Sequence, residues 1–208
     1  MQVACCSGNL KLINLLIEEG SDINSIDNKG RTAMHLSSYY GHKDCLMELA
    51  TEGASSNIND KYNRKPIHLA AMKGHPDACS YLTGRADCDH NSLDSFHRNA
   101  LHYSLMGKTP SHLEISDMLL YDCDVNQQDV NGNTPFMIAV YNNHFTIINR
   151  LECVNINIQN IKGQTSLIIA SYRGFSKIVK LLLNKGNFIF AIFKFTQYFL
   201  IFGNLLIN

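Results

Sequence analysis

The fold of this chain can be read from residues 65–75, Lys65-Pro66-Ile67-His68-Leu69-Ala70-Ala71-Met72-Lys73-Gly74-His75. A proline suits the first turn of a helix, and a glycine suits the left-handed residue that ends one. The stretch therefore predicts a short helix that begins at Pro66 and ends before Gly74. Related stretches return about every 33 residues along the chain, which is typical of repeat architectures.

Two columns of residues define the repeat. One holds small side chains, namely Ala4, Ser37, Ala70, Ser104, Ala139 and Ala170. The other holds leucines at intervals of 33, 33, 37, 32 and 31 residues, namely Leu16, Leu49, Leu82, Leu119, Leu151 and Leu182. Small residues let neighbouring helices approach, and leucines fill the groove between them. The pattern predicts six units that stack on copies of themselves.

Each unit also carries the signals for two helices and a loop. N-cap residues precede the first helix in four units, namely Thr32, Asn99, Thr134 and Thr165. Gly41, Gly74 and Gly174 suit its left-handed end, and a second helix follows, for example over residues 44–51. Polar, Asn-rich stretches such as residues 24–30 have the composition of hairpin turns.

These residues resemble the ankyrin repeat family, whose pattern is Asp-x-x-Gly-x-Thr-Pro-Leu-His-x-Ala-Ala-x-x-Gly-His, a Leu-Leu helix and Gly-Ala-x-x-Asn. Residues 27–35 and 65–75 match it most plainly. The resemblance implies an all-α solenoid of stacked helix-turn-helix units with hairpin loops. Three departures are local: extra residues around 108–111, a shortened end near 153–155, and a first unit that starts inside its own first helix.

The expected domain is residues 1–187, in repeats of about 1–24, 25–57, 58–91, 92–126, 127–157 and 158–187. Residues 188–208 form an apolar tail that holds six of the ten phenylalanines and one charge, Lys194. Twenty apolar residues span about 30 Å as a helix, the thickness of a bilayer core, but Lys194 opposes insertion. Three interpretations stay open: a membrane span through 188–207, an apolar helix packed on the last unit, and a non-native terminus, which we favour.

Charge and cysteine usage exclude several classes of protein. Eighteen Lys and Arg balance eighteen Asp and Glu, whereas nucleic-acid binders carry a basic excess. No nucleic-acid partner is expected. Seven cysteines at irregular spacings, without a signal segment, indicate a reducing, cytoplasmic environment with free thiols.

No catalytic or metal-binding motif is found. The densest possible ligand group is Cys88, His90, His97 and His102, and its spacing matches no usual paired-ligand pattern. The resemblance implies instead that His35, His68 and His102 bond loop backbone or the adjacent unit. The chain lacks a phosphate-binding loop, a nucleophile elbow and a His-Glu-x-x-His motif. We expect no enzyme activity, no cofactor, no metal and no small-molecule substrate.

A stack of such units has one extended concave face, lined by first helices and hairpin tips. In the helices the register and the resemblance place on it Tyr39, Tyr40, Met72, Lys73, Met106, Tyr141, Asn142, Tyr172 and Arg173. In the hairpins they place there Lys29, Arg31, Tyr62, Arg64, Phe96 and Arg98. Tyr and Arg dominate binding hot spots, and Met adapts to irregular apolar surfaces. The alternative is that the tyrosines only cover the groove between helices.

The sequence thus predicts a monomeric, non-enzymatic interaction module or scaffold for a protein or peptide of apolar and acidic character. The alternative is a fragment of a larger ankyrin-containing protein, such as a membrane channel or a regulatory subunit of a phosphatase or ligase. An asparagine recurs near the end of five units, namely Asn24, Asn57, Asn91, Asn126 and Asn157. We expect turn-side hydrogen bonds from these asparagines, and the resemblance also makes them candidates for hydroxylation.

Overall fold

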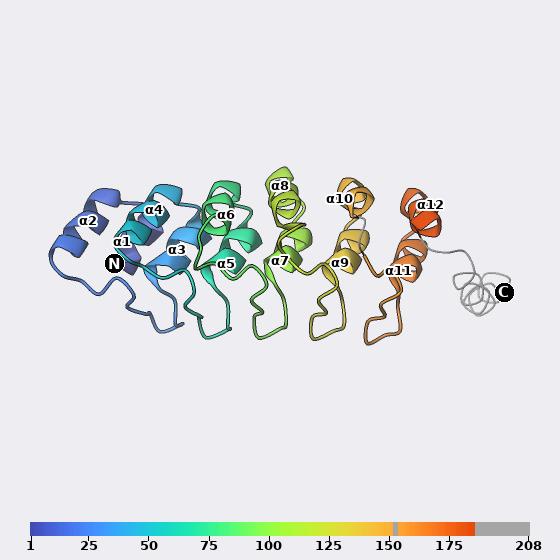
Figure 1. Ribbon diagram of the computed structural model, residues 1–208, viewed down its shortest axis with the longest axis horizontal. Coiled ribbons are helices and arrows are strands. Elements are labelled where there is room, and N and C mark those ends of the chain that lie inside the picture. Colours follow the sequence, from blue (N-terminus) through green and yellow to red (C-terminus); the bar gives the residue numbers. More distant parts are fainter. Residues whose placement is uncertain (152–153, 186–208) are drawn as a thin grey trace.

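The computed structural model describes residues 1–151 and 154–185, and over these residues it is a single row of helix pairs (Figure 1). The helices of this described part are α1 (Gln2–Ser7), α2 (Leu10–Glu18), α3 (Ala33–Tyr40), α4 (Lys43–Thr51), α5 (Pro66–Lys73), α6 (Pro76–Thr83), α7 (Ala100–Met106), α8 (Pro110–Leu119), α9 (Pro135–Tyr141), α10 (Phe145–Arg150), α11 (Ser166–Tyr172) and α12 (Ser176–Lys185). Each successive pair is called a unit, from unit 1 (α1 and α2) to unit 6 (α11 and α12). The predicted all-α solenoid is confirmed.

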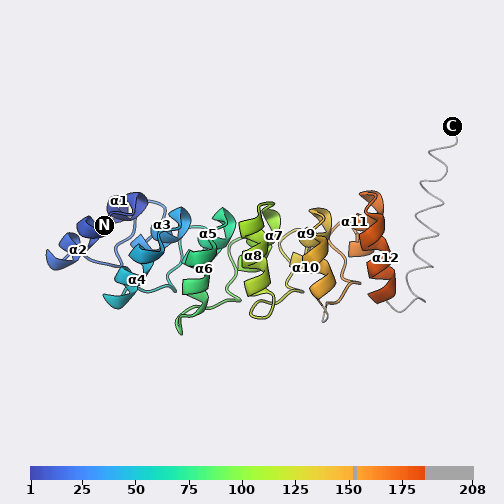
Figure 2. The same ribbon diagram turned by 90° about the horizontal axis from the view of Figure 1, so that it is seen from above.

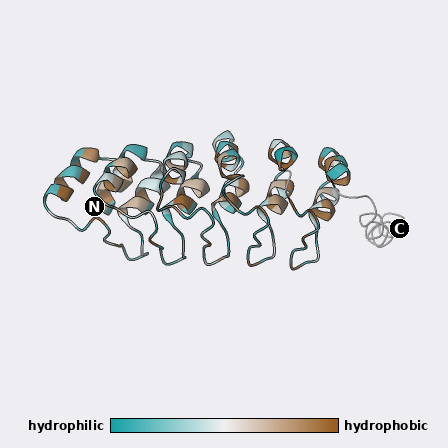
Figure 3. Ribbon diagram, in the orientation of Figure 1, coloured by the Kyte–Doolittle hydropathy of each residue, from teal (hydrophilic) through white to brown (hydrophobic). Residues whose placement is uncertain are grey.

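The units stack into two layers (Figures 1 and 2). The odd-numbered helices pack on one another in order and, with the hairpin loops that hang from them, form the inner layer. The even-numbered helices pack on one another and form the outer layer. Apolar residues gather where the two layers meet, and the outer helices turn polar surfaces away from that contact (Figure 3). The core is therefore a continuous ribbon along the stack.

Local signals set the helix ends as the sequence predicts. The Asn99 side chain accepts from the His102 amide at 3.2 Å, and the Thr134 hydroxyl accepts from the Met137 amide at 3.2 Å. Pro66 begins α5. Gly74 follows α5 in the left-handed conformation with φ 73°, which a residue without a Cβ adopts at least cost.

The leucine column fills the space between the layers. Leu49, Leu82 and Leu119 are fully buried, and Leu151 and Leu182 are nearly so. Leu16 is only half-buried, because in the described structure no unit packs on the free side of unit 1. The small-residue column lies inside as well: Ala70, Ser104, Ala139 and Ala170 are 0% exposed.

Unit 4 takes up its extra residues in a slightly longer turn, residues 107–109, and at the start of a longer second helix, since α8 has 10 residues where α6 has 8. Gly107 ends α7 in an extended conformation, and Thr109 then caps α8 with Pro110 as its first residue. The run Thr109-Pro110-Ser111-His112 thus repeats at an outer helix the Thr-Pro-x-His start that the family pattern places on inner helices. Its His112 still reaches the Met72 carbonyl at 3.3 Å, so stacking continues across the insertion.

The predicted tail, residues 188–208, lies outside the described residues, as do residues 152–153. Within the part of the chain that the structure describes, no helix combines the length and the apolar character needed to cross a membrane.

Candidate functional site

A first ladder of histidines holds the hairpins in place. Nδ1 of His35 accepts from the Thr32 amide at 3.1 Å, so its Nε2 carries the proton and donates to the Arg64 carbonyl of the next unit at 2.9 Å. His68 bonds the Ser92 carbonyl at 2.9 Å and His102 the Asn133 carbonyl at 3.3 Å in the same way. The expectation that these histidines bond the adjacent unit is confirmed.

Burial keeps this first ladder uncharged. It lowers the pKa of His35 and His68, and it lowers the pKa of His102 to about 4, although the Asn133 carbonyl opposes the shift. His90 uses its Nε2 on the Thr83 carbonyl at 3.1 Å. Over the described ranges no three His, Cys, Asp or Glu side chains gather as a metal site.

A second ladder, which the sequence analysis missed, fixes the ends of the inner helices. Its members donate back to carbonyls at the ends of α1, α3, α5 and α7, at 3.2, 3.0, 3.3 and 3.0 Å, and are His42, His75, His112 and His144. A Cβ on Gly41 would lie 2.6 Å from the His75 ring. The Gly-His dipeptides at 41–42 and 74–75 are therefore the sequence signal for this ladder.

Aspartates organise the hairpin loops. Oδ1 of Asp60 accepts from the amides of Tyr62 at 2.8 Å and Arg64 at 2.9 Å, and its Oδ2 pairs with the Arg64 guanidinium at 2.6 Å. Asp27 holds Arg31 in the same way at 2.7 Å. Arg31 and Arg64, which the sequence places on the binding face, therefore also have a structural partner inside their own loops.

Arg98 departs from this arrangement. The Tyr103 hydroxyl donates to Asp94, so Arg98 makes no ion pair with the aspartate of its own loop. Its Nε lies instead 3.6 Å from Oδ2 of Asp129 in the next hairpin, and its guanidinium carbon lies 5.1 Å from the centre of the Phe96 ring. Arg98 therefore joins the hairpins of units 4 and 5, a contact that the repeat pattern does not reveal.

The hairpin tips are joined into one edge by backbone hydrogen bonds of 2.9–3.0 Å, from Lys61, Ser95, Val130 and Ile161 to the preceding loop. Four tips carry exposed apolar side chains, namely Tyr62 (50%), Phe96 (45%), Val130 (47%) and Ile161 (72%). The sequence predicts the two aromatic residues at this face but gives no sign of Val130 and Ile161, because an isolated aliphatic residue in a loop has no repeat signal.

The ends of the inner helices bring together the other predicted residues. One position per unit carries a tyrosine or methionine, here called the Tyr/Met column, which comprises Tyr39, Met72, Met106, Tyr141 and Tyr172. In units 3, 5 and 6 the next residue reaches back to the preceding unit. Nζ of Lys73 lies 4.5 Å from the centre of the Tyr39 ring, and the Arg173 guanidinium lies 4.4 Å from that of Tyr141. Asn142 donates to the Leu105 carbonyl at 2.9 Å.

Charge is divided between the two layers although the chain is neutral. The hairpins and inner helices, residues 25–42, 58–75, 92–109, 127–144 and 158–175, hold ten Lys and Arg but four Asp. The outer helices and their loops hold thirteen Asp and Glu against seven Lys and Arg among the described residues. All four inner aspartates accept from amides of their own hairpins, namely Asp27, Asp60, Asp94 and Asp129. The inner layer therefore presents mainly positive charge.

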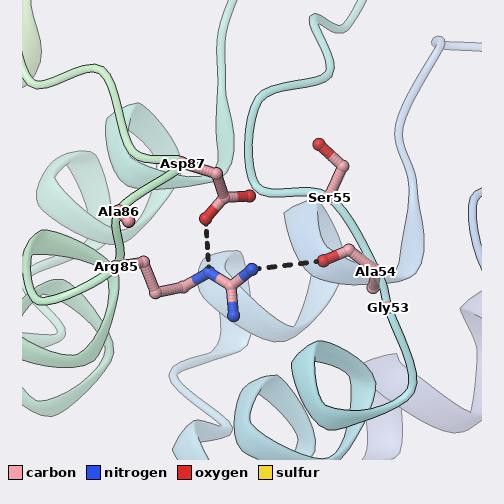
Figure 4. Close-up of a pocket in the computed structure, with 6 residues that line it drawn as sticks. All are labelled: Gly53, Ala54, Ser55, Arg85, Ala86 and Asp87. Atoms are coloured by element: carbon pink, nitrogen blue, oxygen red, sulfur yellow. Dashed lines mark hydrogen bonds and ion pairs between the residues drawn. The ribbon is translucent and has the colours of Figure 1, made fainter.

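The outer layer has a shallow depression between units 2 and 3, lined by Gly53, Ala54, Ser55, Arg85, Ala86 and Asp87 (Figure 4). Arg85 spans it, donating from Nε to Asp87 at 2.8 Å and from Nη2 to the Ala54 carbonyl at 3.4 Å. Partial burial raises the pKa of Asp87. The hydrogen bonds from Arg85 and Ser56 lower it by more than burial raises it, so the pKa is about 2. The depression is a contact between two loops, and its charged side chains, Arg85 and Asp87, are already bonded to each other.

Three of the recurring asparagines join neighbouring units rather than closing their own turns. Asn24 accepts from the Ser55 amide at 3.1 Å, Asn91 from the Asp124 amide at 2.6 Å, and Asn126 from the Asn155 amide at 2.9 Å. The expectation of turn-side bonds is wrong for these three, because the loop of the next unit lies within reach of each side chain.

The comparisons agree with this geometry. A family described as ankyrin repeats (3 copies) matches residues 1–94, 61–129, 83–160 and 111–192. The Notch-regulated ankyrin repeat-containing protein of Xenopus tropicalis is 41% identical over 44 residues, 21% of this chain and 39% of that protein. The human protein of that name is 39% identical over 44 residues, with the same shares. The chain thus matches less than half the length of these relatives. Because the family model matches along most of the chain, the chain belongs to the ankyrin repeat family, whose repeats are protein–protein interaction modules.

Proposed function

We propose that this chain is a non-enzymatic scaffold that binds a segment of a partner protein on its inner face, the exposed side of the inner-helix ends and hairpin tips. The observation that carries the proposal is the Tyr/Met column. Five successive units present a large side chain at the same register, and the second ladder bonds the ends of three of these helices, α3, α5 and α7.

The exposure of this column favours binding over a purely structural role. Tyr141 is 53% exposed and Tyr172 is 78% exposed, so neither ring fills a groove between helices. Tyr39 is half-buried and contacts Tyr40 edge to face at 5.0 Å between ring centres. Aromatic side chains held rigidly lose little conformational entropy when a partner covers them, which is why they dominate hot spots.

The predicted residues divide into those that support the hairpin loops and those that contact the partner. Arg31 and Arg64 have their guanidinium groups engaged by Asp27 and Asp60. We assign the main contacts with the partner to the Tyr/Met column, and assign to the arginines the support of the loops.

The experiment is a selection of binders from a phage library of random peptides on the full chain, followed by measurement of each binder on variants. Tyr39→Ala, Tyr40→Ala and Tyr172→Ala are combined in one chain. We expect the selected peptides to lose at least about tenfold in affinity, or about 1.4 kcal/mol, with an unchanged melting curve.

The matched control is Tyr121→Ala, because Tyr121 is 80% exposed and follows an outer helix. This control should leave binding unchanged. Selected peptides that bind the triple variant as well as they bind the original chain contradict the proposal.

We further propose that residues 1–187 form the module and that it works as a monomer in a reducing compartment. Six described cysteines are free thiols, and burial raises the pKa of Cys45 to about 11 and of Cys88 to about 12, so both stay protonated and unreactive. Light scattering of the chain under reducing conditions tests the monomer, and a dimer mass contradicts it.

A further inference from the structure

We infer that the partner segment is acidic at both ends and apolar between them, and that it lies along the Tyr/Met column from unit 3 to unit 6. The inference rests on the proposed function and adds the chemistry and order of the segment.

The division of charge supplies the first argument. All four aspartates of the inner layer are bonded to amides of their own hairpins, and Asp60, Asp94 and Asp129 are also buried. Ten Lys and Arg belong to the same layer. An acidic segment placed there meets attraction without a competing free carboxylate, and complementary charge of this kind sets specificity and association rate.

Two cations mark where the acidic groups bind. Lys73 and Arg173 stand at the same register and each lies over the tyrosine of the preceding unit, at 4.5 and 4.4 Å from the ring centre. Both side chains are exposed. The ring fixes each cation while its N–H donors remain available at the surface.

The stretch of the Tyr/Met column between these cations carries no charge, with exposed Tyr141 beside two methionines. Met72 and Met106 are half-buried, and the residue that corresponds to Lys73 in unit 4 is Gly107, which has no side chain. In unit 5 the corresponding residue is Asn142, whose amide is already bonded to Leu105. Apolar side chains of a partner fit here, since thioethers adapt to irregular surfaces.

The stack also fixes the separation of the acidic groups. Lys73 and Arg173 are three units apart, and packed helices lie about 8–10 Å from one another, which gives about 24–30 Å. An extended chain advances about 3.3 Å per residue, so the two acidic ends stand about eight residues apart.

The probes are fluorescein-labelled peptides of about ten residues, with two glutamates at each end and leucine, methionine and serine between them, so that the two acidic pairs stand about eight residues apart. Matched peptides carry glutamine or lysine in place of glutamate. Fluorescence anisotropy with the full chain should show the acidic peptide at least about tenfold tighter than the glutamine peptide. Raising the salt from about 0.05 M to about 0.5 M should weaken the acidic peptide selectively.

The decisive variant combines Lys73→Gln and Arg173→Gln, and its matched control combines Lys177→Gln and Lys180→Gln on the outer helix α12. Both remove two exposed positive charges. We expect the first variant to weaken the acidic peptide about tenfold, to the level of the glutamine peptide, and the control to change it less than about twofold. Melting curves of both variants should match that of the original chain.

The inference is overturned if the acidic and glutamine peptides bind equally, if the α12 control weakens binding as much as the decisive variant, or if a single-stranded DNA oligonucleotide binds the face more tightly. If the acidic and glutamine peptides bind equally and both lose binding in the Tyr39, Tyr40 and Tyr172 variant, the acidic chemistry is wrong and the proposed function stands. Binding that survives both this variant and the decisive variant would remove the proposed function as well.

Discussion

Units 2–4 and units 5–6 have the same backbone arrangement but differ in the side chains that join one unit to the next. The third residue of the inner helix is a buried histidine in units 2–4 and is Met137 or Ile168 in units 5 and 6. The last two hairpins are joined by amides instead, with Asn160 bonded to Asn133 at 3.0 Å and Gln128 to the Gln159 carbonyl at 3.0 Å. The stack is therefore set by the shape of its apolar columns, and several polar groups can serve as cross-links.

If shape dominates, the largest loss of stability comes from the leucine column that both halves share. Leu82→Ala empties a fully buried site between units and should cost about 3 kcal/mol. Leu182→Ala at the end of the row should cost about 2 kcal/mol, since fewer units pack around it. Urea unfolding measures both, and an equal or larger loss for Leu182→Ala contradicts the argument.

Exchanging the cross-link between the halves sharpens the comparison. His68→Met leaves the Ser92 carbonyl and the Lys65 amide without their partner and should cost about 2 kcal/mol. Met137→His should cost less than about 1 kcal/mol. His102 bonds the Asn133 carbonyl of the next hairpin, and the Gln164 carbonyl occupies the equivalent position for a histidine at 137. Equal losses for the two exchanges would show that the histidine is not the cross-link.

Acidification should destabilise units 2–4, because it protonates the buried histidines of the first ladder. The pKa of His102 is lowered by burial to about 4, below its ordinary value of 6.5. The unfolded chain then binds the proton more readily, so stability is complete above about pH 6.5 and falls as the pH drops toward 4, by about 1.4 kcal/mol near pH 5.5. His102→Met should reduce the difference in urea midpoint between about pH 7.5 and pH 5.5. An unchanged difference contradicts the assignment.

The smallest effect is expected at an ion pair that joins the two halves. Arg150 on α10 pairs with Asp117 on α8, with side chains 48% and 40% exposed. Solvent screens such pairs, so Asp117→Asn should change stability by less than about 0.5 kcal/mol. A loss near 2 kcal/mol would show that polar cross-links between the halves matter more than shape.

The sequence predicts the repeating parts of this structure well. The helix caps, the leucine and small-residue columns and the first ladder recur at a fixed interval, so each copy supports the others. Leu16 is the exception, because burial depends on a neighbouring unit and not on the residue alone.

The parts that the sequence does not predict depend on single residues or on sums over space. The Tyr103 hydroxyl donates to Asp94, and Arg98 lies beside Asp129 of the next hairpin instead. Predicting this contact requires the positions of these side chains in space. The positive charge of the inner layer cannot be seen in the net charge of the sequence, because equal numbers of acidic and basic residues cancel over the whole chain. The candidate contact residues follow from register, whereas their pairing with cations, as for Lys73 and Tyr39, follows only from the structure.

The most direct test of the inner face as the binding surface is amide hydrogen exchange of the full chain with and without the acidic peptide. The account predicts slower exchange at the ends of α5, α7, α9 and α11 and at the hairpin tips of units 3–6, with α4, α6, α8, α10 and α12 unchanged. Slower exchange confined to the even-numbered helices, or binding that leaves the inner-helix ends unchanged, would contradict it.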